Sequence, residues 1–313
     1  MLQSDPRHYS VLLRECIENL NIKPDGTYLD GTLGMGGHSY QIASRLTTGR
    51  LICIDRDESA LERAGKRLEE FADRISFVHG NFSDCASILD GLGIDGVDGM
   101  LFDLGVSSPQ LDEAERGFSY MNDAPLDMRM DKTEGLSAYD VVNTWDENRL
   151  NRILWDYGEE RYARRITAAI LAEREKKPVE TTLELVDIIR SAMPAAALRE
   201  KQHPAKRSFQ AIRIAVNDEL GAVANMMDTA PDKLNKGGRL CVISFHSLED
   251  RIVKSGIASR ENGCTCPREA PVCTCGFVRT LKSVSRKPIL PSEKELEENP
   301  RSRSAKLRVA EKV

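Results

Sequence analysis

Short apolar runs alternate with amphipathic segments over the first hundred residues. Each apolar run is continuous and bounded by turn residues, which predicts a buried strand. The four runs lie at 27–30, 50–54, 75–78 and 97–102. Helical periodicity occupies 38–47 and 58–71, and Ser83 is predicted to cap a further short helix. Strands separated by helices predict a parallel sheet covered by helices on both faces.

The pattern changes between about residues 113 and 207, where amphipathic helical stretches follow one another with few strand signals. Those stretches are 147–155, 160–175 and 183–192. Beyond them we predict a long helix over 208–227 and strands over 239–244 and 304–310. The simplest organisation is an all-helical domain, 113–207, inserted into a discontinuous α/β domain, 1–112 and 208–313. The charged segment 291–303 is predicted to be a mobile connector.

Composition is that of a soluble globular protein, with 41% hydrophobic and 30% charged residues among 313. No apolar run is long enough to span a membrane, and the first residues lack the layout of a signal peptide, so we expect a cytoplasmic location. The oligomeric state stays open, with a homodimer among the options.

The net charge of −5 does not favour nucleic-acid binding, but basic residues are concentrated in two places. The run 299–313 is one of them. The other is the stretch 199–213, which contains five basic residues and one acid. We take this stretch, with its His203 and Phe209, as the candidate for phosphate contacts. Its basic residues are Arg199, Lys201, Lys206, Arg207 and Arg213.

A glycine-rich turn, 30–38, joins the first predicted strand to the first helix. Ligands of open parallel sheets bind at the carboxyl ends of strands, and Asp55 ends the second strand about twenty residues further on, as a ribose-binding acid does. Ser39 stands where a dinucleotide fingerprint needs its third glycine. Asp30 would repel a pyrophosphate but suits a cationic amine and sulfonium. The turn therefore favours S-adenosylmethionine over a dinucleotide, which remains the alternative; Phe82 is either an adenine contact or a core residue.

A polar, proline-closed loop follows the fourth strand, at 103–110. Transfer of a methyl group to a neutral amine needs alignment and hydrogen-bond acceptors for the amine hydrogens rather than a strong base. Asp103, Ser107 and Ser108 are the candidate acceptors, although the serines could simply form a turn. His246, after the strand at 239–244, is a candidate on the base side or a helix cap. Methylation at a ring carbon is disfavoured because no Pro-Cys nucleophile loop is present.

Seven motifs in this order resemble one known family, the bacterial 16S rRNA (cytosine-N4)-methyltransferases, RsmH or MraW. They are DGTLGMGGHS at 30–39, IDRD at 54–57, GNFS at 80–83, FDLGVSSPQLD at 102–112, RGFSY at 116–120, PLDMRMD at 125–131 and SFHSLEDR at 244–251. The resemblance implies a class I S-adenosylmethionine-dependent fold, Rossmann-like with a mostly parallel seven-stranded sheet and an inserted all-helical domain that recognises RNA. It also implies N4 methylation of a cytidine in the decoding centre of the 30S subunit. The cofactor contacts that it implies are Gly36, Gly37, His38, Asp55, Phe82, Asp103 and Gln110.

Two other classes of function remain open at this point. A non-catalytic RNA-binding factor could retain the nucleoside site, although the acids at Asp55 and Asp103 favour an enzyme. A DNA amine methyltransferase would share the chemistry and differ in its target. Phe118 or Tyr120 could stack on a flipped-out cytosine or belong to the core of the insert, and Asp127 could pair with Arg129.

Four cysteines form one cluster within twelve residues, which is enough for a tetrahedral zinc site. The C-x-C spacing leaves free thiols or a redox pair as alternatives. The cluster comprises Cys264, Cys266, Cys273 and Cys275. The other cysteines are isolated, and Cys53 and Cys241 lie in strand-like runs, where cysteine behaves as a small buried hydrophobe.

Overall fold

The computed structural model describes residues 10–133, 135–267, 272 and 274–313. By internal contacts the chain divides into two compact units, Met1–Gly105 with Leu220–Val313, and Val106–Glu219. The second unit extends beyond the predicted limits 113–207 at both ends. Val106 and Leu111 pack against its core before residue 113, and the helix that begins at Lys206 contributes its apolar side to that core beyond residue 207. None of the helices in the described ranges is long and apolar enough to cross a bilayer.

The first unit is built on a seven-stranded sheet of order β3-β2-β1-β4-β5-β7-β6. The strands are β1 (Thr27–Asp30), β2 (Arg50–Asp55), β3 (Ile75–His79), β4 (Val97–Asp103), β5 (Leu234–Ser244), β6 (Leu281–Ser283) and β7 (Lys306–Lys312). Neighbours from β3 to β5 pair in parallel, while β7 pairs antiparallel with both β5 and β6. Every strand predicted from the sequence is present. Strand β6 was not predicted, because three residues are too few to show a period.

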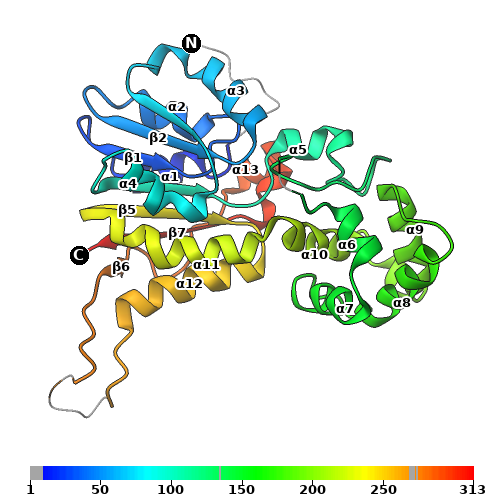
Figure 1. Cartoon of the computed structure of the whole chain (residues 1–313). Helices are drawn as coiled ribbons and strands as arrows, with labels where there is room; N and C mark the ends of the chain where they lie inside the picture. The colour runs from blue at the N-terminus through cyan, green and yellow to red at the C-terminus, as the bar shows by residue number, and fades with distance from the viewer. Residues whose placement is uncertain (1–9, 134, 268–271, 273) are drawn as a thin grey trace. The chain divides into compact units, whose positions relative to one another are not determined.

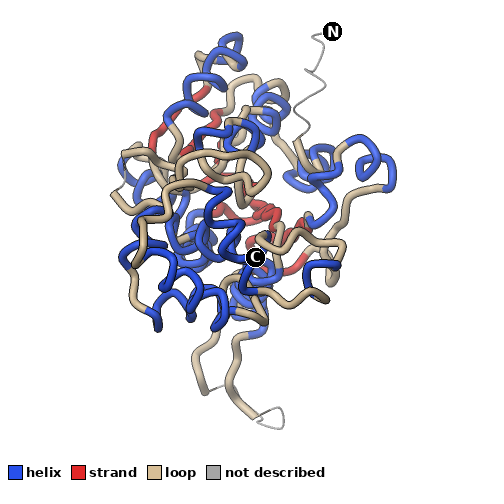
Figure 2. The backbone as a smooth tube through the Cα atoms, turned by 90° about the vertical axis from the view of Figure 1, so that its right-hand side faces the viewer, coloured by secondary structure: helices blue, strands red, loops and turns tan. Residues whose placement is uncertain are grey.

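Helices cover both faces of this sheet (Figures 1 and 2). On one face, Leu51 and Cys53 pack with helices α1 (Leu13–Leu20), α2 (Gly37–Ala43) and α3 (Glu58–Arg67). On the other, Ile52 and Ile54 pack with helices α4 (Cys85–Gly91), α11 (Glu219–Thr229) and α12 (Ser247–Asn262). Alternate side chains of β2 point to opposite faces of the sheet, and each face packs against an apolar layer. The side chains on both faces are therefore apolar, and the strand is a continuous hydrophobic run in the sequence.

The segment predicted as one long helix is two helices, α10 (Lys206–Asn217) and α11. The chain breaks at Asp218, whose φ is 47°. Just before the break, the Asn217 side chain accepts from the Met130 amide at 2.8 Å and donates to the Met128 carbonyl at 2.8 Å. A buried amide that satisfies two distant backbone groups accounts for the end of α10 at this residue.

The prediction of a connector at 291–303 is wrong, because this segment forms α13 (Glu293–Glu298) and a 3-10 helix (Pro300–Ser304). The Ser292 side chain accepts from the Glu295 amide at 3.2 Å, which caps α13. The Glu295 carboxylate in turn accepts from the Leu12 amide at 2.7 Å. The sequence carried the signal, since serine followed three residues later by glutamate is a helix-start pattern.

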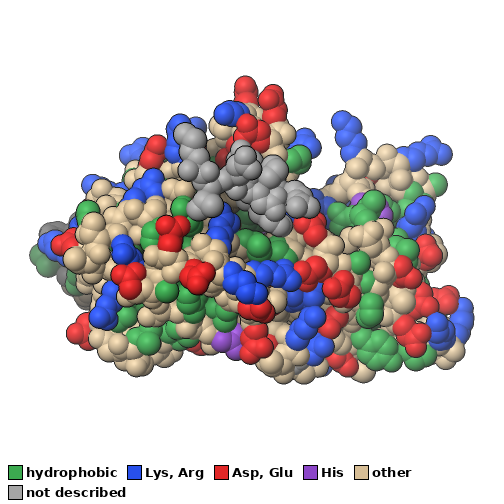
Figure 3. All heavy atoms as spheres, turned by 90° about the horizontal axis from the view of Figure 1, so that it is seen from above, with side chains coloured by type: hydrophobic (Ala, Val, Ile, Leu, Met, Phe, Trp, Pro, Cys, Tyr) green, Lys and Arg blue, Asp and Glu red, His purple; other side chains and the backbone are tan. Residues whose placement is uncertain are grey.

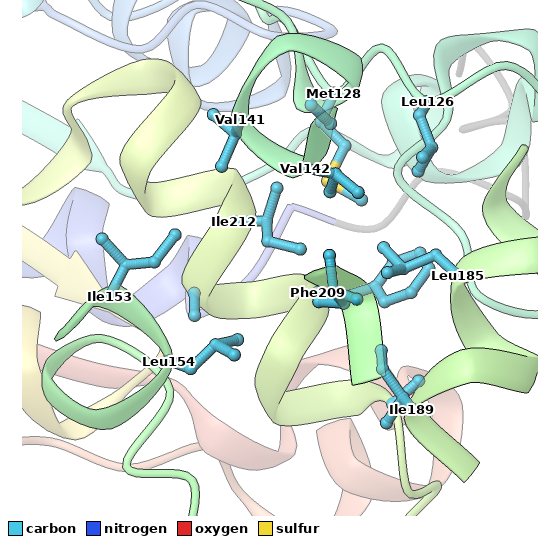
Figure 4. Close-up of a cluster of buried hydrophobic side chains, with 14 of the residues drawn as sticks. Leu126, Met128, Val141, Val142, Ile153, Leu154, Leu185, Ile189, Phe209 and Ile212 are labelled. Atoms are coloured by element: carbon cyan, nitrogen blue, oxygen red, sulfur yellow. The ribbon is translucent and has the colours of Figure 1, made fainter. Parts of the chain in front are cut away.

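The second unit is a set of helices around one apolar core (Figure 4). The helices are α5 (Ser108–Asp112), α6 (Ala138–Thr144), α7 (Glu147–Asp156), α8 (Ala163–Arg174), α9 (Thr182–Ala192) and α10. Phe209 and Ile212 of α10 point into this core, where Leu185 of α9 meets them. The predicted ion pair is confirmed, with Arg129 Nε 2.8 Å from an Asp127 oxygen.

Candidate functional site

Three acids end three neighbouring strands of the first unit, at the same edge of the sheet. Asp30 ends β1, Asp55 ends β2 and Asp103 ends β4, and the sheet order places β1 between the other two. The strands are parallel, so their carboxyl ends meet at one edge, as the sequence predicted for Asp55 and Asp103. Three acids in a row make this edge suited to a cationic ligand.

Asp30 is 1% exposed and is held by the turn that follows it. Ser39 donates its hydroxyl to one carboxylate oxygen at 2.6 Å, and the Thr32 amide donates to the other at 3.1 Å. Burial raises the pKa of Asp30 to about 6, although these two hydrogen bonds oppose the rise. Ser39, which breaks the dinucleotide fingerprint, is therefore the hydroxyl that orients Asp30.

The glycine turn needs its glycines for two different reasons. Gly34 and Gly36 have φ of 50° and 72°, in the region that favours glycine. At Gly37 the constraint is space, because a Cβ there would lie 1.9 Å from the Ser10 hydroxyl. Glycine at these positions keeps the backbone of the turn bare.

Asp55 fixes the turn from the neighbouring strand. One carboxylate oxygen accepts from the Gly34 amide at 2.7 Å, and the other accepts from the Asp57 amide at 2.9 Å. Burial raises the pKa of Asp55. Each oxygen of a carboxylate has a second lone pair, so Asp55 retains the capacity to accept from a ligand hydroxyl.

His38 is buried and neutral. Its Nε2 lies 3.1 Å from the Val11 carbonyl, so Nε2 carries the proton and Nδ1 is left as an acceptor. Burial lowers the pKa of His38 to about 4. Nδ1 lies 3.8 Å from an Asp103 oxygen. At neutral pH this imidazole offers a lone pair rather than a positive charge.

Asp103 has the most unusual environment of the three acids. Its backbone amide donates to the Thr32 hydroxyl at 2.6 Å, while its Oδ1 is buried without a hydrogen-bond partner among the described residues. Burial raises the pKa of Asp103 well above its usual range, and the charges of Asp30, Glu249 and Glu295 raise it further. A buried carboxylate oxygen without a partner is costly, which makes this atom the natural place for a ligand donor.

Phe82 follows the carboxyl end of β3 in the chain. Its ring packs edge-on against Phe102 of β4, with ring centroids 6.0 Å apart at 60°. The residue is half-buried, and a Cβ at Gly31 would lie 3.3 Å from its Cβ. Phe82 is thus partly a core residue, and its contact with adenine stays a prediction.

His246 caps α12, which is the less specific of its two predicted roles. The Glu249 amide approaches its Nδ1 at 3.5 Å, and the Glu249 carboxylate accepts from the Phe245 amide at 2.8 Å. Glu249 is 1% exposed. A role of His246 toward the base stays a prediction.

Ser107, Ser108 and Gln110 belong to the second unit, whereas Asp103 belongs to the first. Ser107 is the N-cap of α5, and the Gln110 side chain accepts from the Ser107 amide at 3.0 Å. Their structural role is therefore to begin α5. Their roles toward the cofactor and the amine stay predictions.

The candidate phosphate-binding stretch has an exposed part and an engaged part. Arg213 forms two hydrogen bonds of 2.8 Å with the Glu219 carboxylate, and Phe209 is 3% exposed in the core, so neither is available to RNA. The exposed members are Arg199, Lys201 and Lys206.

A small hollow of the second unit adjoins this stretch. Arg161, His203 and Arg207 are among the residues that line it. Tyr120 stacks on His203 with ring centroids 4.5 Å apart, whereas Phe118 is a core residue. Basic and aromatic side chains around one hollow are what single-stranded RNA readers use.

The second basic run, 299–313, has a structural role in the first unit. Arg308 donates to both oxygens of Asp250, at 2.6 and 3.1 Å, which joins β7 to α12. Lys306 lies 3.5 Å from the same carboxylate. Over one face of the molecule, acidic and basic side chains are interspersed (Figure 3).

Three cysteines of the predicted cluster come together. The Sγ atoms of Cys264, Cys266 and Cys275 all lie within 4.8 Å of one another. Cys273 lies outside the described residues. Hydrogen bonds from Thr274 lower the pKa of Cys266. The isolated cysteines Cys16, Cys53, Cys85 and Cys241 are buried.

Sequence reasoning missed several residues that shape the site. Thr32 fixes the Asp103 backbone, and Glu249 and Glu295 add negative charge around its carboxylate. Glu249 carried a detectable signal, since it stands three residues after the cap of α12. Glu295 is remote in sequence, and no local pattern indicates its electrostatic effect on Asp103.

The chain is similar in sequence to known methyltransferases. Residues 5–313 match the MraW methylase family. Ribosomal RNA small subunit methyltransferase H of Brevibacillus brevis is 57% identical over 307 residues, which cover 98% of each chain. The protein of the same name from Clostridioides difficile is 56% identical over 307 residues, or 98% of this chain and 99% of its own. An rRNA methylase structure from Streptococcus thermophilus is similar over 100% of this chain and 99% of its own, with 12% identity and a TM-score of 0.42.

The predicted fold class is confirmed by the sheet and by the family. A mostly parallel seven-stranded sheet, with β7 inserted antiparallel beside β5, is the sheet of class I S-adenosylmethionine-dependent methyltransferases. The family match extends over both units, from residue 5 to residue 313. The chain belongs to the MraW methylase family.

Proposed function

We propose that this chain methylates the N4 amine of a cytidine in the 16S rRNA of the small ribosomal subunit, at the decoding centre, with S-adenosylmethionine as donor. The observation that carries the proposal is the row of three acids around the glycine turn, in which Asp30 is 1% exposed and Asp103 Oδ1 is buried without a partner among the described residues. The names of the relatives support the target, since both methylate small-subunit ribosomal RNA.

The residues present fit the donor better than they fit a dinucleotide. Burial raises the pKa values of Asp30 and Asp103, so the ionised acids gain from a nearby positive charge. S-adenosylmethionine carries a sulfonium and an ammonium, whereas a dinucleotide carries a pyrophosphate that these acids would repel. We infer that the bare backbone at Gly36 and Gly37, the spare lone pairs of Asp55 and the ring of Phe82 hold the nucleoside part. Gln110 and His38 complete the proposed contacts.

When bound, S-adenosylmethionine supplies a methyl group that is open to in-line displacement by a neutral amine. The chain's part is to orient the amine and to receive its hydrogens. The N4 nitrogen of cytosine is a weak nucleophile because its lone pair is delocalised into the ring. Asp103 Oδ1, as an acceptor for an amine hydrogen, would favour a pyramidal nitrogen. Ser107, Ser108 and His246 are the further candidates for contact with the base.

The raised pKa of Asp103 suits it to a second task. A methylated amine must lose one proton, and a carboxylate with a raised pKa can hold that proton until water removes it. His38 Nδ1, 3.8 Å from an Asp103 oxygen, is a second acceptor beside it. Both groups belong to the first unit.

We assign RNA binding to the second unit. Its exposed basic residues, together with His203 and Arg207 at the hollow, offer phosphate and base contacts. The net charge of −5 does not oppose this assignment, because basic residues outnumber acids five to one in the stretch 199–213, although Glu160 and Glu200 also line the hollow.

The test is transfer of labelled methyl groups to 30S subunits and to free 16S rRNA from a strain that lacks this gene. Nucleoside mass spectrometry should find N4-methylcytidine, or its 2′-O-methylated form, in small-subunit RNA only. Asp103→Asn should abolish transfer while Asp98→Asn, a change at an acid outside the site, should not. Label in DNA would establish the DNA enzyme instead. Cofactor binding without transfer to any nucleic acid would establish a binding factor.

A further inference from the structure

An extension of the first unit lies between α12 and β6. None of the described residues between Asn262 and Leu281 belongs to a helix or a strand. Figures 1 and 2 show its two arms side by side, one leaving α12 and the other entering β6. The base is tied by polar contacts, since the Thr280 amide donates to the Arg260 carbonyl at 3.1 Å and Arg279 donates to Glu261 at 2.6 Å.

The described residues in the outer part of the extension form no apolar core. Val272 and Val278 are 70% and 74% exposed. Phe277 does pack, but against the base, where a Cβ at Gly263 would lie 2.8 Å from its ring. A segment without buried apolar surface cannot offset the entropy of ordering its backbone.

Sulfur atoms connect the two arms where apolar contacts do not. Cys264 on the first arm and Cys275 on the second have their Sγ atoms 3.6 Å apart. Cys266 completes a triangle in which all three Sγ atoms lie within 4.8 Å. The Thr274 amide donates to the Cys266 sulfur at 3.2 Å, which aligns the arms at this level.

We propose that Cys264, Cys266 and Cys275 bind one structural zinc ion that ties the arms of this extension together. A zinc–sulfur bond of about 2.3 Å in a tetrahedron puts neighbouring sulfurs about 3.8 Å apart. The 3.6 Å between Cys264 and Cys275 matches that edge. It is too long for a disulfide, which needs about 2.05 Å. The site is separate from the glycine turn and does not depend on the proposed function.

Zinc is the metal that this ligand set favours. Thiolates select zinc, copper(I) or iron–sulfur clusters, and three thiolates converging on one tetrahedral centre suit a single zinc ion. The fourth position takes one more thiolate or a water molecule. Each thiol must lose its proton on binding, so zinc binding becomes weaker as the pH falls. The metal replaces the missing core, as it does in other small structural elements.

The first test is the metal content of the full chain, purified without chelator and measured by plasma mass spectrometry. We expect about one zinc ion per chain. Cys264→Ser with Cys275→Ser should remove it, and Val278→Ser, an exposed change on the same arm, should keep it. Cys273→Ser distinguishes the two options for the fourth ligand. Weaker zinc binding would indicate a thiolate at Cys273, and unchanged binding would indicate a water molecule.

Two further measurements do not depend on the variants. Cobalt(II) exchanged into the unaltered chain should give an intense thiolate-to-metal absorption and tetrahedral ligand-field bands. A chelator should speed proteolysis within 263–280 by about tenfold or more, because the released arms open more often.

Several results would overturn the proposal. The first is that the unaltered chain retains no zinc after exposure to zinc under reducing conditions. The second is that the mass of the intact chain shows a disulfide and no bound metal, which is the redox-pair alternative. Iron with visible absorption would identify a cluster. Zinc that survives loss of both Cys264 and Cys275 would lie at another site.

Discussion

Replacement of Asp30 by asparagine should stabilise the first unit without ligand and weaken its cofactor site. The pKa of Asp30 rises from 3.8 to about 6 in the fold. A group whose folded pKa is raised contributes stability below its unfolded pKa, and that stability is lost as the pH rises through about 6. At 1.36 kcal/mol for each pKa unit, the ionised form costs about 3 kcal/mol at pH 7.5. Asparagine does not ionise and avoids this cost.

The hydrogen bonds at this position survive the change. The asparagine oxygen can accept from the Thr32 amide, and its amino group can donate to the Ser39 hydroxyl. That hydroxyl can then donate to the Cys53 sulfur, which lies 3.3 Å away. The second N–H of the asparagine amide gains no partner from these groups, which costs about 1 kcal/mol, so Asp30→Asn should raise the free energy of unfolding by about 2 kcal/mol at pH 7.5 and by less than about 1 kcal/mol at pH 5.

The assay is hydrogen exchange of the amides in β1 and β2, which reports opening of the first unit. Tryptophan fluorescence would report the wrong unit, because Trp145 and Trp155 both belong to the second. In the same samples, affinity for S-adenosylmethionine should fall roughly tenfold, since one charge interaction in a partly buried site is worth about 1–2 kcal/mol. A variant that is less stable than the parent at pH 7.5, or a difference that does not change with pH, would refute the reasoning.

Asp98 provides a control of opposite sign. Burial alone would raise its pKa, but hydrogen bonds from Lys23 at 2.9 Å and from the Thr27 amide at 3.1 Å outweigh burial and hold the pKa below its ordinary value. Asp98 therefore contributes stability at neutral pH that is lost as the pH falls through its folded pKa. Asp98→Asn should destabilise the first unit while leaving the affinity for S-adenosylmethionine unchanged.

Four further predictions concern other residues of the two units. Gly36→Ala should lower the free energy of unfolding by about 1–2 kcal/mol and weaken cofactor binding measured by calorimetry, because φ at Gly36 is 72°. Gly65→Ala, with open space around the new methyl group, should leave the free energy of unfolding unchanged or raise it. Asn217→Leu should destabilise the second unit by about 2–3 kcal/mol in urea titrations followed by tryptophan fluorescence, since two buried backbone groups lose their partner. Lys206→Glu should weaken RNA binding and lower its salt dependence in filter-binding assays, with stability unchanged. Affinity for S-adenosylmethionine should rise as the pH increases through about 6, where Asp30 ionises, and a flat profile between pH 5 and 8 would contradict this assignment.

Local patterns predicted the parts of the molecule that local forces determine. The strands ending at Asp55 and Asp103 were predictable because buried parallel strands are short apolar runs, and their ends indicate where a ligand binds. The break at Asp218 was not, because it follows from contacts that Asn217 makes with residues almost ninety positions away. The charge of Glu295 near Asp103 is likewise a product of tertiary structure. The helix at 293–298 is different, since its capping pattern was present and was outweighed by the charge of the segment.

The order of strands in the sheet has a consequence for synthesis on the ribosome. β4 ends at Asp103, and its partner β5 begins only at Leu234, after the whole second unit has been made. At about 5–20 residues per second, the edge of β4 waits roughly 7–26 s for that partner. During this interval the apolar edge of β4 is exposed near the exit tunnel of the ribosome. There it can bind chaperones or pair with a neighbouring nascent chain. Slower translation through the second unit should therefore lower the yield of soluble protein more than the same delay after Val313.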